Sequence, residues 1–145
     1  MGCRGNIEII QPKLGHTSGE VSIYLYTHWG GEELCQDLAR GLDKGQGRWL
    51  DPDYLTRIIF NEMQKDERGT TGFGISGYPA GDAEFPTPSL FWPTTENRLG
   101  YQQPHDLMIQ YEADFYSPDE FIEKFLPAET VSPALQDTQE IPVVS

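Results

Sequence analysis

Basic residues are scarce in this chain. Its 145 residues include 10 Lys and Arg against 23 Asp and Glu, which gives a formal net charge of −13. Proteins that bind nucleic acid or anionic membranes through charge need clustered basic residues to neutralise phosphate groups. The composition therefore argues against general nucleic-acid binding and against binding to an anionic membrane surface. It favours a basic protein partner that is attracted by the acidic field.

Long apolar runs and cysteines are also few. No stretch approaches the roughly 18 apolar residues of a membrane-spanning helix, and the start MGCRGN has no apolar signal segment. The two cysteines, Cys3 and Cys35, predict reduced thiols and a cytoplasmic location. Cys35 falls on the apolar side of a predicted helix, which favours a buried and unreactive thiol over a catalytic pair with His28.

Spacings typical of metal sites and of the phosphate-binding P-loop are missing. The histidines, His16, His28 and His105, form no HxH, HxxxH or HExxH pattern, and the cysteines are not in compact pairs. No P-loop motif with its lysine is present. We therefore expect no metal and no cofactor, and a protein that is not an enzyme is the preferred interpretation. A hydrolase that uses His28 as acid or base is the third alternative.

Hydrophobic periodicity predicts an α+β domain over residues 1–126. The segment 21–29 alternates apolar and polar residues, as a half-buried strand does. Asp51-Pro52 begins one helix, and the capping box Ser117–Glu120 begins another. The predicted strands are 6–12, 21–29, 89–92, 97–101 and 107–115, with a strand or bend at 72–76, and the predicted helices are 31–42, 51–67 and a short one that ends before Pro127.

We read this order as β-β-α-α-β-β-β-α, a mostly antiparallel sheet with the helices packed on one face. Strands 89–92 and 97–101 are expected to form a hairpin. The strand 107–115 is expected to place Leu107, Ile109, Tyr111, Ala113 and Phe115 on one face. Residues 127–145 hold acids and prolines but no base, which is typical of a flexible tail.

The stretch YLYTHWGG, residues 24–31, is the best place to expect a small-ligand pocket. A strand that runs through glycines into a helix offers free N–H groups to an anion, and aromatic rings on the strand can stack on a nucleotide base. Glu32 and Glu33 oppose this, because they repel an anion at the same helix start. In the simpler alternative, the aromatic residues cover a sheet face and the glycines form a tight turn. The candidate ligand-binding residues are Tyr24, Tyr26, His28, Gly30, Gly31 and Arg98.

Acidic residues concentrate in the second half of the chain. Residues 73–145 carry 12 acids and only two bases, Arg98 and Lys124. One interpretation is a solvated acidic face with an acidic tail, and the other is a surface that binds a basic partner. The candidate partner-binding acids are Asp82, Glu84, Glu112, Asp114, Asp119, Glu120 and Glu123. Asp82 and Glu84 as a metal-binding pair are less favoured, because they lie in a loop between prolines.

Several phrases of the sequence resemble a family of small uncharacterised proteins from phages and bacteria. These phrases are MGCRGNIEI, YLYTHWGG, RIIFNEM and TTGFGIS, followed by SPDEFIEKF, and the resemblance covers about residues 1–126. It implies a small accessory protein that binds host factors, and it brings no catalytic residues with it.

Three functions follow from these observations. The leading one is a non-enzymatic binding or inhibitory protein that acts on a host macromolecule through its acidic surface. The second is a protein that binds or sequesters an anionic, nucleotide-like small ligand at the YLYTHWGG turn, and the third is the His28 hydrolase. An exposed aromatic patch is also compatible with a homodimer surface.

Overall fold

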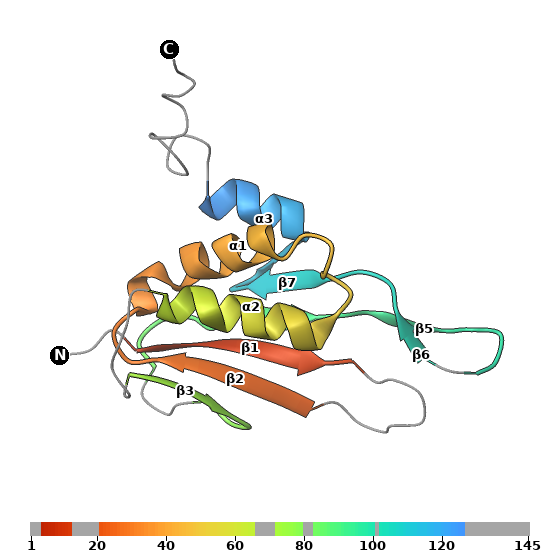
Figure 1. Ribbon diagram of the computed structural model, residues 1–145, viewed down its shortest axis with the longest axis horizontal. Helices are drawn as coiled ribbons and strands as arrows, with labels where there is room; N and C mark the ends of the chain where they lie inside the picture. The colour runs from red at the N-terminus through yellow and green to blue at the C-terminus, as the bar shows by residue number, and fades with distance from the viewer. Residues whose placement is uncertain (1–3, 13–20, 66–71, 80–82, 101, 127–145) are drawn as a thin grey trace, which may run out of the picture.

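A computed structural model describes residues 4–12, 21–65, 72–79, 83–100 and 102–126 (Figure 1). The tail 127–145 and Asp82 lie outside the described residues. The elements in chain order are β1 (Gly5–Gln11), β2 (Val21–Thr27), the 3-10 turn η1 (Gly31–Glu33), α1 (Leu34–Lys44), α2 (Pro52–Gln64), β3 (Phe73–Ser76), β4 (Ser89–Phe91), β5 (Thr94–Glu96), β6 (Gln102–Pro104), β7 (Met108–Tyr111), β8 (Asp114–Tyr116) and α3 (Pro118–Phe125).

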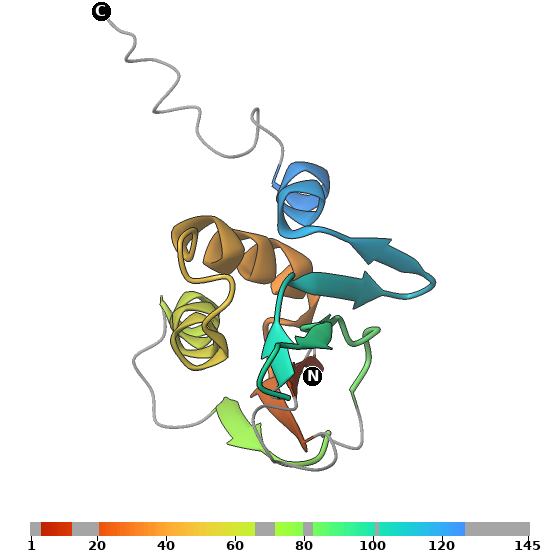
Figure 2. The same cartoon turned by 90° about the vertical axis from the view of Figure 1, so that its right-hand side faces the viewer.

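The main sheet has six strands in the order β3-β2-β1-β4-β7-β8. Only the β1–β4 pair is parallel, and the other four pairs are antiparallel. Strands β5 and β6 form a separate antiparallel hairpin. The helices cover one face of the sheet (Figure 2). These findings confirm the predicted α+β class with a mostly antiparallel sheet.

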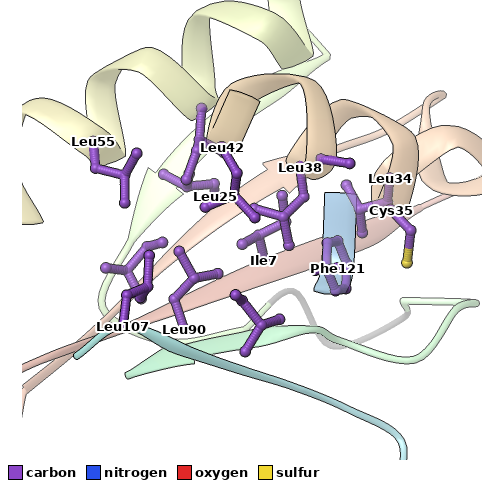
Figure 3. Packing of buried hydrophobic residues seen from close by; sticks show 14 of the residues in the cluster. Ile7, Leu25, Leu34, Cys35, Leu38, Leu42, Leu55, Leu90, Leu107 and Phe121 are labelled. Atoms are coloured by element: carbon purple, nitrogen blue, oxygen red, sulfur yellow. The ribbon is translucent and has the colours of Figure 1, made fainter. Parts of the chain in front are cut away.

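The hydrophobic core lies between the sheet and the helices (Figure 3). Ile7 and Ile9 of β1 pair with Leu25 and Ile23 of β2, and these side chains lie on the helix side because strand residues alternate between faces. Leu38 and Leu42 of α1 and Leu55 and Ile59 of α2 complete the centre. The opposite face of the sheet carries Glu8, Tyr24 and Tyr26, which occupy the alternate positions.

Two helix starts follow the predicted capping chemistry. The carboxylate of Asp51 accepts a hydrogen bond from the Tyr54 backbone N–H at 3.5 Å, and Pro52 occupies the first turn of α2. Ser117 Oγ accepts from the Glu120 N–H at 3.2 Å, and Glu120 Oε1 accepts from the Ser117 N–H at 2.8 Å. The capping box therefore fixes where α3 begins. None of the helices described is long and apolar enough to cross a membrane.

The strand pairing predicted for residues 89–115 is wrong. Strand β4 pairs with β1 and β7, so the segment 89–92 is a central strand and not half of a hairpin with 97–101. The hairpin in this region joins β5 to β6 instead. The predicted strand 107–115 is broken at Glu112, which has a φ of 55°, into the hairpin β7–β8. This turn reverses the chain, so Phe115 does not share the buried face of Ile109.

Candidate functional site

The side chains of the YLYTHWGG stretch divide between the two faces of the sheet. Tyr24 and Tyr26 lie on the face opposite the helices. The Tyr26 hydroxyl is 3.0 Å from His28 Nδ1, and the His28 ring meets the Trp29 indole edge to face with ring centroids 4.7 Å apart. Trp29 and Gly30 instead line a cavity on the helix side. The structure thus offers two separate places for chemistry where the sequence predicted one.

Glu8 is the centre of the polar cluster on the open face. Its carboxylate accepts hydrogen bonds from Ser22 Oγ at 2.8 Å, Tyr24 Oη at 2.9 Å and Ser89 Oγ at 2.7 Å. Burial opposes the charge on Glu8, but the three hydroxyl donors outweigh it and lower the pKa of the carboxyl. The donors come from β2 and β4, on either side of β1, so the cluster joins three strands.

Sequence reasoning missed Glu8. Glu8 is the one acid in the apolar strand sequence NIEII. A partly buried carboxylate needs hydrogen-bond or ion-pair partners, so this position could have indicated a polar cluster. Ser22 and Tyr24 follow from the hairpin register, whereas Ser89 is 81 positions away along the chain and joins only through the β1–β4 pairing. Because all three hydroxyls donate to one carboxylate, this cluster is a structural network that stabilises the sheet.

The cavity beside Trp29 has a volume of about 230 Å³. It lies where the turn after β2, the first turn of α1, the end of α2 and β3 meet. The rings of Trp29 and Phe73 form its apolar walls, together with Met63. Its charged walls hold more acids than bases, namely Glu32, Glu33, Asp37 and Glu62 against Arg40 and Lys65.

Two of these acids are buried. Asp37 accepts a hydrogen bond from Arg40, and Glu62 Oε2 accepts from Lys44 Nζ at 2.5 Å. Burial raises the pKa of Asp37 to about 6, because desolvation outweighs the attraction of Arg40. Glu33 raises this pKa further through its negative charge. A carboxyl whose pKa lies near neutrality, inside a cavity, is a common feature of functional sites.

Arg98 does not join the other candidate ligand-binding residues. It lies in the turn between β5 and β6, at the end of the sheet away from the start of α1 (Figure 1). It lines a different hollow with Asn97, Leu99 and Gln103. Gly31 is buried, with its Cα 3.4 Å from where a Cβ on Gly5 would lie, so it packs against β1. The expected grouping of the tyrosines with an arginine is therefore not formed.

The Cys35 thiol is buried, as the sequence predicted. Burial is the main reason that its pKa is raised to about 11, although a hydrogen bond with Tyr111 opposes the shift. We expect Cys35 to resist iodoacetamide at pH 8, because roughly one thiol in a thousand is then ionised. Mass spectrometry of the Cys3→Ser variant, native and in urea, measures this. Rapid labelling of the native protein would contradict the assignment.

Only some of the acids predicted to bind a partner lie close together. Asp114, Glu120 and Glu123 line one groove between β8 and α3, with a volume of about 410 Å³. Glu112 lies in the adjoining β7–β8 turn. Asp119 lines another hollow with Trp49 and His105. Glu84 forms an ion pair with Arg4 at 3.5 Å and is separate from the groove residues.

The β8–α3 groove combines uncompensated charge with an exposed ring. Among the described residues, Glu112, Asp114 and Glu123 form no ion pair, in contrast to Glu62. Phe115 is 57% exposed and meets Phe91 edge to face, with ring centroids 6.1 Å apart. Lys124 is the one cation among the groove residues described. No described cluster of three His, Cys, Asp or Glu side chains is arranged to hold a metal ion.

Comparison with known proteins adds no assignment. No protein-family model matches the sequence, and neither curated proteins nor solved structures include a similar chain.

Proposed function

We propose that this protein is a non-enzymatic binding protein that holds a basic segment of a partner protein in the β8–α3 groove. The observation that carries the proposal is that the groove carboxylates Asp114 and Glu123 have no ion-pair partner in the described structure, while the exposed Phe115 ring lies on the opposite face of β8. Exposed aromatic rings and charged side chains next to one another are typical of protein interfaces. Basic residues of the partner would supply the counter-charges.

The position of β8 favours an extended partner. In the six-stranded sheet β8 pairs only with β7, so its outer edge has backbone groups available for pairing. A peptide can add to such an edge through main-chain hydrogen bonds while its side chains meet the groove. Alternating lysine and apolar residues would place the charges toward the acids and the apolar side chains toward Phe115. The resemblance to phage proteins supports a partner from the host cell.

A labelled peptide of alternating lysine and valine tests this proposal by fluorescence anisotropy. We expect binding that weakens steeply between 50 mM and 500 mM NaCl, because surface charges are screened. The double variant Asp114→Asn/Glu123→Gln should bind at least about tenfold more weakly, which corresponds to about 1.4 kcal/mol. Phe115→Ala should also weaken binding.

The matched control removes two acids elsewhere. Asp53 in α2 and Glu96 in β5 are exposed and outside the groove, so Asp53→Asn/Glu96→Gln makes the same change in net charge. We expect this control to bind nearly as well as the unchanged protein. If both double variants bind the peptide equally weakly, net charge and not the groove determines the affinity. If the affinity does not change with NaCl concentration, the electrostatic role of the groove is refuted.

A further inference from the structure

We infer that two copies of this protein pair through the outer edge of β3, antiparallel and about a two-fold axis at Gly74, and so form a dimer with one continuous sheet. The strand order places β3 at one edge of the main sheet and β8 at the other, and among the described strands β3 pairs only with β2 (Figure 1). This inference goes beyond the proposed function, because a dimer joined at β3 leaves the β8–α3 groove of each copy free at the far ends of the joined sheet.

The backbone of β3 offers two residues to a second strand. The His28 N–H donates to the Gly72 carbonyl at 2.8 Å, where β3 begins to pair with the end of β2. In an antiparallel pair, hydrogen-bonded residues alternate with residues whose N–H and C=O groups point the other way. In the observed register, every second residue from Gly72 therefore bonds to β2. The N–H and C=O groups of Phe73 and Ile75 point to the outer edge.

A two-fold axis at Gly74 lets a second β3 use all of these outward groups. In this register Phe73 lies opposite Ile75 of the second copy, and Ile75 lies opposite the second Phe73. Each of these pairs exchanges N–H···O bonds in both directions. The two Gly74 residues meet at the axis as a pair without hydrogen bonds, where the Cα atoms of two strands approach to about 4.5 Å. A glycine fits this closest approach because it has no side chain.

The side chains at this edge are apolar and accessible. Ile75 is 60% exposed, and Tyr78, just beyond β3, is 73% exposed. Phe73 packs against the core and meets Phe60 of α2 edge to face, with ring centroids 6.4 Å apart. In the proposed register, Ile75 of the second copy covers Phe73, because residues directly opposite each other share a face of the sheet. A pair of an aromatic and a β-branched side chain stabilises antiparallel strands.

The distribution of charge favours a second copy at β3 and opposes one at β8. Residues 69–81 contain no charged side chain, although 23% of the chain is charged. Strand β3 also lacks the lysine, proline or bulge by which edge strands commonly avoid pairing. Pairing of two copies through β8 would bring Glu112 and Asp114 close to the same acids of the other copy, and facing like charges are destabilising.

Oxidation of single cysteines tests the register. In the described structure, the nearest atom to a Cβ built on Gly74 belongs to the Tyr26 ring, at 3.9 Å, so Gly74→Cys fits the existing backbone. In a Cys3→Ser background, two such cysteines would have Cα atoms about 4.5 Å apart, within the range of a disulfide. The matched control is Ser76→Cys, on the same face of β3, whose two copies would be more than about 13 Å apart along the strands.

Under oxidation by copper phenanthroline, we expect Gly74→Cys to form covalent dimers at least about tenfold faster than Ser76→Cys, because only the first pair meets the geometry of a disulfide. Intact-mass spectrometry under non-reducing conditions measures both rates. No covalent dimer of Gly74→Cys, or equal rates for the two variants, would overturn the inference.

Sedimentation equilibrium measures the association without a crosslink. From about 10 µM to about 1 mM, a range suited to the weak affinity of a small interface, the unchanged protein should pass from monomer to dimer and no further, because two-fold pairing uses up the β3 edge. Ile75→Lys should raise the dissociation constant at least about tenfold, because it places a charge against Phe73. Leu99→Lys makes the same change at a side chain that is 79% exposed, in the β5–β6 turn, and should leave the dimer unchanged.

Salt separates this dimer from the groove. Two copies that each carry a net charge of −13 repel each other, so raising NaCl from 50 mM to 500 mM should strengthen the dimer, whereas it should weaken peptide binding. Asp114→Asn/Glu123→Gln should keep the dimer and lose the peptide. A protein that stays monomeric at the highest concentration in 500 mM NaCl, or a dimer that Ile75→Lys leaves intact, would overturn the inference.

Discussion

Replacing Phe121 with alanine is expected to lower the free energy of unfolding by about 3–5 kcal/mol, the usual cost of deleting a buried aromatic side chain. Phe121 is fully buried in α3, and its ring centroid lies 5.5 Å from that of Tyr116 and 4.5 Å from that of Phe125. The same ring belongs to the core shared with α1 (Figure 3). Urea unfolding followed by tryptophan fluorescence measures the loss.

Loss of Phe121 should also disrupt the β8–α3 groove, because this ring holds α3 against the rest of the domain. Phe115→Ala is the matched control, since it removes the same ring from an exposed position. We expect it to cost about 1 kcal/mol or less, mainly the contact with Phe91. Phe115→Ala should therefore lose peptide binding while remaining folded. Similar stability losses in the two variants would mean that α3 does not depend on its buried ring.

Local sequence patterns correctly predicted those features of the fold that depend on residues close together in the chain. The alternation in β2 reports which side chains face the core, because the two faces of a strand differ in burial. Asp51, Pro52, Ser117 and Glu120 act within one helical turn, so their capping roles can be read from adjacent residues. The burial of Cys35 likewise follows from the helical spacing of its apolar neighbours.

Pairing between distant strands could not be predicted in this way. Strand β4 has only three residues, and nothing within it indicates that β1 and β7 are its neighbours. The hairpin β7–β8 depends on Glu112 adopting a positive φ, which is uncommon for a residue other than glycine. The periodicity continued through this turn, so the pattern placed Phe115 on the wrong face.

The same distinction applies to the candidate sites. Of the six residues predicted to bind a ligand, Gly30 alone is among the described residues that line the cavity, and its acidic walls come partly from α2, which is distant along the chain. The sequence analysis did not identify Glu62 as a candidate site residue, because an acid near the end of a predicted helix is usually exposed to solvent. Asp114, Glu120 and Glu123 were expected to be acidic surface residues, and the β8–α3 contact brings them to one groove.

Asp37→Asn is expected to change how stability depends on pH. The pKa of Asp37 is raised from 3.8 to about 6 in the folded protein, so between these values the folded chain binds more protons than the unfolded chain. Stability therefore falls as pH rises from about 4 to about 6, by about 2–3 kcal/mol from this group, and the cost persists above pH 6. Asparagine stays neutral at every pH and avoids this cost.

The decisive quantity is the difference in unfolding free energy between Asp37→Asn and the unchanged protein, measured in urea at pH 4, 5, 6 and 7. The difference should shift in favour of the variant by about 2–3 kcal/mol over this range. Glu8, whose lowered pKa gives stability that is lost as pH falls, is present in both proteins and cancels. Asp43→Asn removes one exposed acid from the same helix and controls for net charge. A flat difference for Asp37→Asn would show that Arg40 and Lys65 fully offset the burial of this carboxyl, and the cavity would then hold one more negative charge at mildly acidic pH.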